Sequence, residues 1–213
     1  MIRPCTEVDL AEVSAVINEA AEAYRGVIAA DRWHDPYMPL DELRSEAEAG
    51  VVFWGVEAGG RLEAVMGLQQ VADVALIRHA YTRPTSQHQG LGSALLGHLR
   101  ALTNPPMLVG TWAAATWAVQ FYQARGFELV APAEKNDLLR RYWRVPARQI
   151  EESVVLADSR WRAQAGPAAG ADQDDQGRND TCPSSPPMEP SAANRPRRKV
   201  RSGSFVASSA ARA

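Results

Sequence analysis

Residues 83–96, RPTSQHQGLGSALL, form a junction between two kinds of secondary structure. The preceding apolar run, residues 74–81, is typical of a strand. The leucines after the junction recur at the spacing of one helix face: Leu91, Leu95, Leu99 and Leu102. The polar loop between them contains Gly90 and Gly92. Backbone N–H groups at a helix start have no partner within the helix, the helix dipole favours negative charge there, and glycine allows close approach. The stretch therefore predicts a loop that binds phosphate groups.

Three phosphate-loop patterns compete for this stretch. A P-loop needs Lys followed by Ser or Thr after its last glycine, and the chain has no such pair there. The dinucleotide fingerprint Gly-x-Gly-x-x-Gly fails at its last position, which is Leu95. The pattern Gln/Arg-x-x-Gly-x-Gly/Ala is matched at every defined position by residues 87–92. Further along the chain, residues 121–127 read FYQARGF.

Both segments resemble the GNAT N-acetyltransferase superfamily, and the order of predicted elements extends the resemblance over residues 1–157. Residues 87–92 are similar to the coenzyme A signature of that superfamily, and residues 121–127 match its Tyr-x-x-x-Gly-Phe segment. The resemblance implies an α/β fold with a mixed, splayed central sheet flanked by helices. It also implies an acyltransferase that uses acetyl-coenzyme A as co-substrate. The coenzyme A would lie between the strands at residues 74–81 and 107–112.

The resemblance further implies which residues contact the cofactor. The pyrophosphate would rest on the loop and the first helical turn: Gln87, His88, Gln89, Gly90, Leu91, Gly92 and Ser93. The pantetheine arm would pair with the backbone of the fourth strand at His79, Ala80 and Tyr81. The superfamily often has a cofactor-contacting Asn where this chain has Ala115, so we expect that contact to be missing.

Acyl transfer to an amine requires that the amine lose a proton, and the departing thiolate benefits from gaining one. By resemblance, Tyr122 is the general acid; the alternative is a packed aromatic ring whose hydroxyl only satisfies a hydrogen bond. His79 is the candidate base because an imidazole titrates near neutral pH. The alternative is a histidine that is hydrogen-bonded on the far face of the sheet. Strand alternation predicts that the neighbouring Arg78 points the opposite way.

The loop that joins the first two predicted helices is rich in aromatic residues. By resemblance it flanks the acceptor entrance, where Trp33, His34 and Tyr37 would shape the pocket for an amine acceptor. Aromatic packing over the sheet edge is the alternative. The sequence leaves open whether the acceptor is a small molecule, a peptide or a protein side chain. A rival function is a non-catalytic domain that binds or senses acyl-coenzyme A.

Hydrophobic periodicity and turn residues predict the order β, α, α, β, β, β, α, β, α, β, with more strand at the end. A capping box at Thr6 and Asp9 begins the first helix. The predicted helices cover residues 9–25, 40–49, 90–102 and 114–125, and residues 134–143 are a further helical segment. The predicted strands cover residues 2–3, 51–56, 62–71, 74–81, 107–111, 127–130 and 153–156.

The chain has 213 residues, of which 46% are hydrophobic and 23% charged, and its formal net charge is −2. This composition is ordinary for a soluble globular protein and gives no reason to expect nucleic acid or a membrane as a partner. The N-terminus lacks the pattern of a secretory signal, so we expect a cytoplasmic location. The oligomeric state stays open, with a homodimer among the alternatives.

The composition changes after Trp161, because residues 162–213 contain no Leu, Ile, Tyr or Trp. We therefore predict an N-acetyltransferase domain at residues 1–160 and a disordered low-complexity tail at residues 161–213. Residues 177–183, GRNDTCP, resemble the opening of the SEC-C zinc motif. No Cys or His follows Cys182, and a zinc site needs about four ligands, so we predict no metal.

Overall fold

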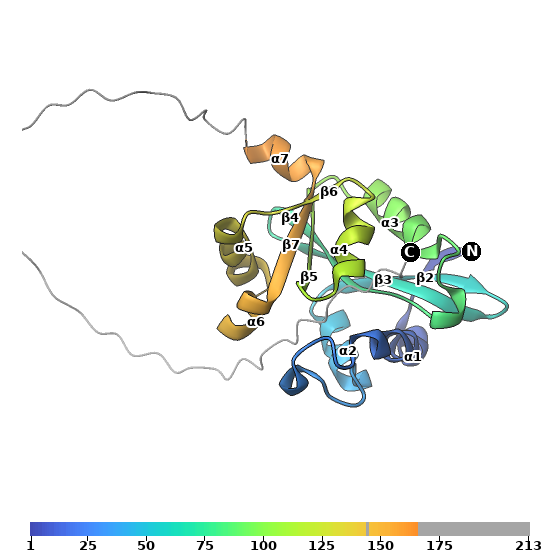
Figure 1. The fold of residues 1–213 in the computed structure, drawn as a ribbon. Helices are drawn as coiled ribbons and strands as arrows, with labels where there is room; N and C mark the ends of the chain where they lie inside the picture. The colour runs from blue at the N-terminus through green and yellow to red at the C-terminus, as the bar shows by residue number, and fades with distance from the viewer. Residues whose placement is uncertain (144, 166–213) are drawn as a thin grey trace, which may run out of the picture.

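The computed structural model of the chain describes residues 1–143 and 145–165. Within them, seven strands form a single mixed sheet in the order β1-β2-β3-β4-β5-β7-β6 (Figure 1). The β4–β5 pair is parallel and the other neighbouring strands are antiparallel. The strands are β1 Ile2–Pro4, β2 Val51–Ala58, β3 Arg61–Val71, β4 Val74–Thr82, β5 Met107–Trp112, β6 Phe127–Leu129 and β7 Ser153–Asp158.

Helices cover both faces of this sheet, and α1 and α2 lie below it in Figure 1 whereas α3 lies above it. The α-helices are α1 Leu10–Ala21, α2 Leu40–Glu48, α3 Leu91–Leu102, α4 Thr116–Gln123, α5 Pro132–Leu138, α6 Ala147–Glu152 and α7 Ser159–Ala165. A π-helical turn, Leu139–Trp143, continues α5. Short 3₁₀ turns cover Glu7–Asp9, Glu22–Tyr24, Ala30–Arg32 and Pro84–Ser86. This is the α/β fold with a mixed, helix-flanked sheet that the sequence predicts.

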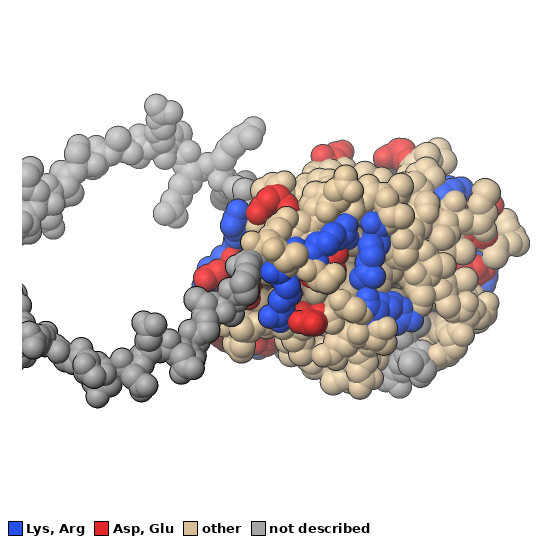
Figure 2. Space-filling view, turned by 90° about the horizontal axis from the view of Figure 1, so that it is seen from above, with Lys and Arg blue, Asp and Glu red and all other residues tan. Residues whose placement is uncertain are grey.

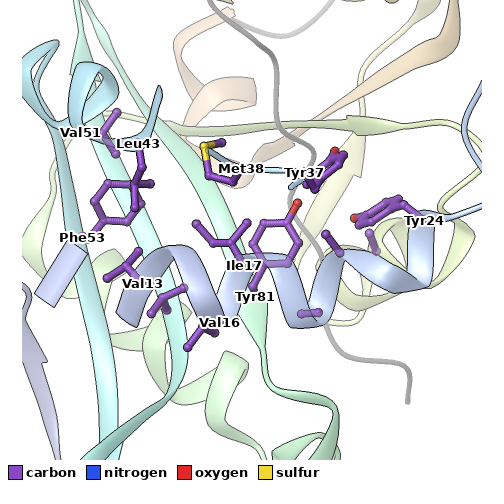
Figure 3. Packing of buried hydrophobic residues seen from close by; sticks show 14 of the residues in the cluster. Val13, Val16, Ile17, Tyr24, Tyr37, Met38, Leu43, Val51, Phe53 and Tyr81 are labelled. Carbon is purple, nitrogen blue, oxygen red and sulfur yellow. The ribbon is translucent and has the colours of Figure 1, made fainter. Parts of the chain in front are cut away.

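The α1 helix is amphipathic, and its apolar face packs on the sheet. Val13, Val16 and Ile17 are fully buried and join Leu43 of α2 and Phe53 of β2 in one cluster (Figure 3). Burying each such side chain contributes roughly 1.5–3 kcal/mol to folding. This cluster fixes α1 and α2 against the sheet beside the end of β4.

The sheet splays apart between β4 and β5. Their register consists of three residue pairs, the last of which joins Ile77 to Val109. Directly beyond it, β4 contains a bulge, since Arg78 pairs with Gly67 of β3 and Tyr81 with Val65. The bulge coincides with His79, whose φ of 47° lies in the left-handed region. A bulge bends its strand, so β4 turns away from β5 at this point. The predicted splay between the fourth and fifth strands is thus confirmed.

The end of the domain differs from the sequence-based prediction. The α7 helix runs across the predicted boundary at residue 160, and the indole N–H of Trp161 donates to Glu134 Oε1 at 2.8 Å. The composition change after Trp161 therefore does not mark the end of the folded part. The remainder of the predicted tail, including residues 177–183, lies outside the described residues. Within the described ranges, no helix is both long enough and apolar enough to cross a bilayer.

Candidate active site

The loop after β4 has the geometry of a phosphate-binding site. Gly90 precedes α3 with a φ of 78°, and His88 has a φ of 62°. In the described part of the chain, the backbone N–H groups of His88 and Gly90 donate to no backbone carbonyl outside the helices and strands. The first N–H groups of α3 likewise have no acceptor one turn earlier within the helix. Together these groups form a cluster of donors, at the positive end of the helix dipole, that can bind an anion.

These donors border a cavity of about 520 Å³ between the start of α3 and one side of α4. Residues of the predicted coenzyme A loop line it: His88, Gly90, Leu91, Gly92 and Ser93. The other lining residues are Thr82, Ser86, Trp117, Gln120, Phe121, Ala124 and Arg125. Within the loop, the side chains of Gln87 and Gln89 turn back to carbonyls of Thr82 and Thr85, at 3.4 and 3.5 Å. These two side chains therefore stabilise the loop and do not line the cavity.

Sequence reasoning missed the α4 wall of the cavity, although a signal for it was present. Trp117, Phe121 and Ala124 recur at intervals of four and three residues, which places them on one helix face. Gly92 lies where α3 comes close to α4. A Cβ atom there would lie 3.4 Å from the ring of Phe121 and 3.8 Å from the hydroxyl of Thr82, which are ordinary van der Waals distances.

The strand residues of the predicted cofactor site divide into two groups. Ala80 and Tyr81 line a smaller void, which Gly92 and Phe121 also border, so the structure brings them next to the loop. His79 lines neither that void nor the larger cavity. Over the described ranges, His, Cys, Asp and Glu side chains form no group of three or more that could hold a metal ion.

His79 lies in a buried ion-pair cluster with Arg78 and Glu46. The imidazole is fully buried, its Nε2 contacts Glu46 Oε2, and Arg78 Nη2 donates to Glu46 Oε1 at 3.0 Å. Burial opposes ionisation of Glu46, but the interactions with His79 and Arg78 outweigh it and hold the pKa of its carboxyl below the ordinary value. The expectation that Arg78 and His79 point opposite ways was wrong, because the bulge interrupts the two-residue alternation of β4. His79 as general base stays a prediction.

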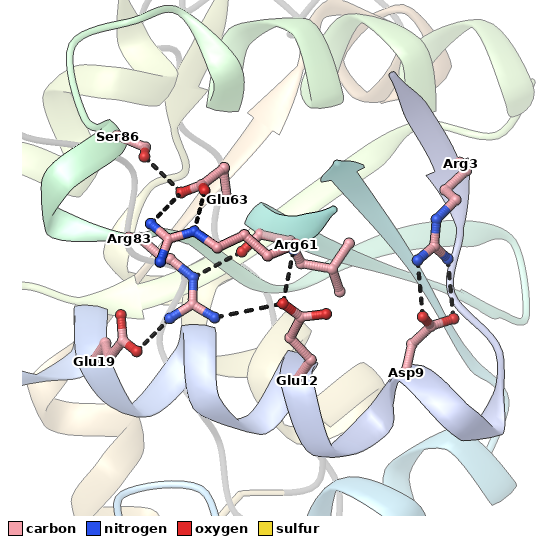
Figure 4. Close-up of polar contacts among 9 residues, drawn as sticks. Arg3, Asp9, Glu12, Glu19, Arg61, Glu63, Arg83 and Ser86 are labelled. Atoms are coloured by element: carbon pink, nitrogen blue, oxygen red, sulfur yellow. Dashed lines mark hydrogen bonds and ion pairs between the residues drawn. The ribbon is translucent and has the colours of Figure 1, made fainter. Parts of the chain in front are cut away.

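A second polar cluster anchors the phosphate loop to the rest of the fold, and sequence reasoning missed it. The buried Arg83 donates from Nε to the carbonyl of Leu62 at 2.7 Å and pairs with Glu19 of α1 (Figure 4). The Ser86 hydroxyl donates to Glu63 Oε2 at 2.6 Å. Arg83 precedes the 3₁₀ turn that begins the loop, and Ser86 is the last residue of that turn. The cluster therefore fixes the direction in which the chain leaves β4.

Tyr122 lies on α4 but inside the core. It is fully buried, and its ring packs edge-on against Phe121 at 5.1 Å and Phe127 at 5.4 Å. It also interacts electrostatically with Arg125, which borders the cavity, and with Tyr81, which borders the smaller void. Its packing matches the alternative of a buried aromatic ring, and its neighbours place it beside the cavity and the smaller void. Its role as general acid stays a prediction.

The predicted acceptor residues gather in an aromatic cluster between α1 and the sheet. The Tyr37 ring stacks on Trp33 at 5.1 Å and on His34 at 6.0 Å. Figure 3 shows the hydroxyls of Tyr24, Tyr37 and Tyr81 turned toward one another. Burial, followed by the neighbouring Tyr37 and Tyr24, raises the pKa of Tyr81 well above its ordinary value. Whether these residues bind an acceptor stays a prediction.

One further contact links this aromatic cluster to the cavity. Trp117 lines the cavity and packs on Tyr24, with 5.3 Å between the ring centroids. Trp112 is buried in the cluster that also contains Tyr24. The loop that contains Tyr37, the end of β4 and the α4 wall thus meet around Tyr24.

The comparisons with known proteins agree with this fold. Residues 49–129 match the family model of the acetyltransferase (GNAT) domain, and this match spans β2 to β6. A comparison with curated protein sequences gives no significant match. Residues 49–129 are therefore similar to the GNAT acetyltransferase domain.

Solved structures show the same fold. The chain is similar to PaiA N-acetyltransferase from Thermoplasma acidophilum, solved in complex with coenzyme A, with a TM-score of 0.54 and 17% identity over 74% of this chain and 97% of that one. An acetyltransferase of the GNAT family from Staphylococcus aureus gives a TM-score of 0.57 and 13% identity over 74% and 97%. The smu.2055 protein of Streptococcus mutans gives 0.53 and 17% over 62% and 85%.

Proposed function

We propose that this chain transfers the acetyl group of acetyl-coenzyme A to a primary amine. The observation that carries the proposal is the position of the cavity, where a phosphate-binding helix start adjoins the splay between β4 and β5. The pyrophosphate would lie on the N–H groups around Gly90. The pantetheine arm would run toward the backbone of β4 beyond Ile77. From that residue on, β4 no longer pairs with β5.

The reaction proceeds by direct attack. The neutral amine nitrogen attacks the thioester carbonyl carbon, and backbone N–H groups of the bulged end of β4 stabilise the oxyanion. The carbon–sulfur bond then breaks, and the thiolate takes a proton from Tyr122. Removal of the amine proton falls to His79 or to a water relay, and the relay fits the structure better because His79 contacts Glu46 and lines neither the cavity nor the smaller void.

The rival function is a non-catalytic module that binds acyl-coenzyme A. Two observations favour it: no carboxylate lines the cavity in the described part of the chain, and His79 is buried. The rival predicts binding of acetyl-coenzyme A without chemistry.

A thiol-release assay separates the two functions. Acetyl-coenzyme A is mixed with the protein and a panel of small-molecule, peptide and protein amines, and free coenzyme A thiol is followed. The proposal predicts thiol release that depends on one class of amine, with an acetylated product confirmed by mass. Saturable binding of acetyl-coenzyme A without release above the uncatalysed rate for every amine would instead establish the binding module.

A further inference from the structure

The bulge in β4 contains a strained residue beside the splay of the sheet. Two residues of β4, His79 and Ala80, lie opposite one residue of β3, Met66. His79 has a φ of 47°, in a region that residues with a Cβ atom rarely occupy because it costs them free energy. Such a conformation persists only where the surrounding structure holds it. The contacts of His79 therefore show what keeps the bulge in place.

Glu46 of α2 is the polar group that holds this residue. The His79 imidazole is fully buried, and its Nε2 contacts Glu46 Oε2. Its Nδ1 has no hydrogen-bond partner in the described part of the chain, so Glu46 is the one polar tether of the ring there. The other oxygen of Glu46 accepts from Arg78 Nη2 at 3.0 Å. One carboxylate thus holds two consecutive residues of β4 at the point where the bulge begins.

This ion-pair cluster is removed from solvent, unlike the charged groups on the surface. Lys and Arg side chains gather on the face that Figure 2 shows, whereas the side chains of Glu46 and Arg78 are 11% and 13% exposed. Taking charges out of water costs free energy that their attraction often only offsets, so a buried ion pair is weak evidence for a gain in stability. A role in fixing geometry accounts better for its position.

The neighbouring strands are fitted closely to the bulge. Gly67 of β3 pairs with Arg78, and a Cβ atom at Gly67 would lie 2.8 Å from Val51 Cγ1 and 3.1 Å from the Arg78 carbonyl oxygen. A side chain there would push against the backbone at the start of the bulge. The ring of Phe53 on β2 packs against the His79 ring, with 5.7 Å between the centroids. Residues of α2, β2 and β3 thus hold one conformation of β4.

The bulge lies where the proposed function needs the thioester carbonyl. Ile77 is the last residue of β4 that pairs with β5, and Ala80 borders the smaller void next to the phosphate loop. In the proposed reaction, backbone N–H groups at this end of β4 stabilise the oxyanion. Such donors must be held in position before the reaction, because a displacement of about 1 Å can cost about 100-fold in rate. The ion-pair cluster fixes the backbone that carries them.

We propose that Glu46 is a positioning residue for acetyl transfer, which acts through His79 by holding the left-handed conformation of the bulge. The His79 side chain is then a tether for its own backbone and not a base. The inference rests on the proposed function, since it needs a thioester carbonyl at the splay. It predicts that changes at Glu46 and His79 lower kcat and leave the affinity for acetyl-coenzyme A almost unchanged.

Two replacements of His79 separate a tether from a base. His79→Ala and His79→Gly both remove the imidazole, but only Gly adopts a positive φ without strain. We expect both variants to lose activity, with kcat about 5- to 30-fold lower for His79→Ala than for His79→Gly, the factor by which a Cβ atom disfavours this conformation. Thiol release from acetyl-coenzyme A with the fastest amine of the panel measures kcat. Equal rates for the two variants would overturn the proposal, because the backbone conformation would then not set the rate.

The carbonyl of the bound ligand tests Glu46 itself. Acetyl-coenzyme A labelled with ¹³C at the thioester carbonyl has an infrared band whose frequency falls as hydrogen bonds to its oxygen strengthen. We expect a lower frequency on the wild type than in solution, and loss of most of this shift in Glu46→Gln. In the same variant kcat should fall about 10- to 100-fold, with KM for acetyl-coenzyme A within about twofold of the wild type. Glu48→Gln, exposed on the same helix, should match the wild type.

The failures of the two proposals are distinguishable. A Glu46→Gln variant that keeps the wild-type kcat, or that keeps the wild-type carbonyl frequency while kcat falls, would overturn the positioning role. Melting curves with and without acetyl-coenzyme A establish that each variant is folded and binds the ligand, and the His79 pair decides the proposal if Glu46→Gln does not fold. If the wild type binds acetyl-coenzyme A but releases no thiol with any amine, the proposed function fails and the positioning role with it, before any variant is compared.

Discussion

Glu46 is a buried carboxylate whose charge is compensated by Arg78 and His79. Since its pKa is lowered in the folded protein, the unfolded chain binds the proton more tightly than the folded state does. Glu46 therefore stabilises the fold above its unfolded pKa of about 4.3, and this contribution is lost as the pH falls through the lower folded value.

Replacing Glu46 with Gln tests this coupling. We expect Glu46→Gln to lower the free energy of unfolding at neutral pH by about 1.5–3 kcal/mol, because two basic partners lose an ionised acceptor. The deficit should shrink as the pH falls below about 4. Urea unfolding over a pH series measures it, with the exposed Glu48→Gln in the same helix as control. A deficit independent of pH would mean that the carboxylate is not ionised in the fold.

Tyr122 is the residue on which the chemical step depends in our proposal. Tyr122→Phe keeps the ring between Phe121 and Phe127 and removes the proton donor. We expect kcat to fall by about 10²–10⁴-fold, with acetyl-coenzyme A affinity almost unchanged, because the proton is needed mainly in the transition state. Tyr142→Phe, which removes a hydroxyl bonded to Asp73, should leave kcat unchanged. Wild-type turnover by a folded, cofactor-bound Tyr122→Phe would show that this tyrosine serves packing only.

At the scale of elements, the effect on stability of replacing a glycine can be compared at two places in α3, its start and its middle. Gly90 precedes the helix with a φ of 78°, whereas Gly97 lies in the helix, is exposed and has no atom within 4 Å of a built Cβ. Gly97→Ala should raise the free energy of unfolding by about 0.5–1 kcal/mol. Gly90→Ala should lower it by about 1–2 kcal/mol, since an L side chain is strained in this conformation.

Denaturant midpoints of the two variants give the answer directly. Opposite signs are the expected result, because both positions have room for a methyl group and differ in backbone conformation. If Gly90→Ala were stabilising like Gly97→Ala, the left-handed start of α3, and with it the geometry of the phosphate loop, would be wrong.

The sequence predicts those elements whose residues follow one regular period. The leucines of α3 predict the helix, and the glycines at residues 87–92 predict where it begins and that the loop before it binds phosphate groups. These predictions succeed or fail on local spacing alone. The bulge at His79 could not be predicted, since it breaks the alternation that such reasoning assumes. The same bulge brings Arg78 and His79 to Glu46, a partner on a helix far away in the sequence.

The cavity wall was missed for a related reason. Arg125 stands in the segment FYQARGF, which resembles a segment of the GNAT superfamily, yet its contact with Ser93 depends on how α3 and α4 pack. In the same way, Arg83 pairs with Glu19 only because α1 crosses the sheet beside the end of β4. Contacts between distant segments carry no local period, so a single sequence does not reveal them.

At the scale of the whole molecule, the described fold ends with α7, which docks through Trp161 on Glu134. We expect a chain that ends at residue 165 to keep the melting temperature of the full chain within about 2 °C, a shift that corresponds to less than about 1 kcal/mol. Parallel melting curves of the two proteins test this. A clearly lower melting temperature, or loss of acetyl-coenzyme A binding, would show that residues 166–213 contribute to the domain.

Thermal unfolding with and without acetyl-coenzyme A tests the central claim most directly, because the ligand must bind the native cavity to stabilise it. At a ligand concentration about 100 times Kd, the native state gains about 2.7 kcal/mol, which raises Tm by roughly 5–10 °C for a domain of this size. We predict a rise in Tm that grows with the logarithm of the acetyl-coenzyme A concentration. An unchanged Tm at millimolar acetyl-coenzyme A would contradict the account.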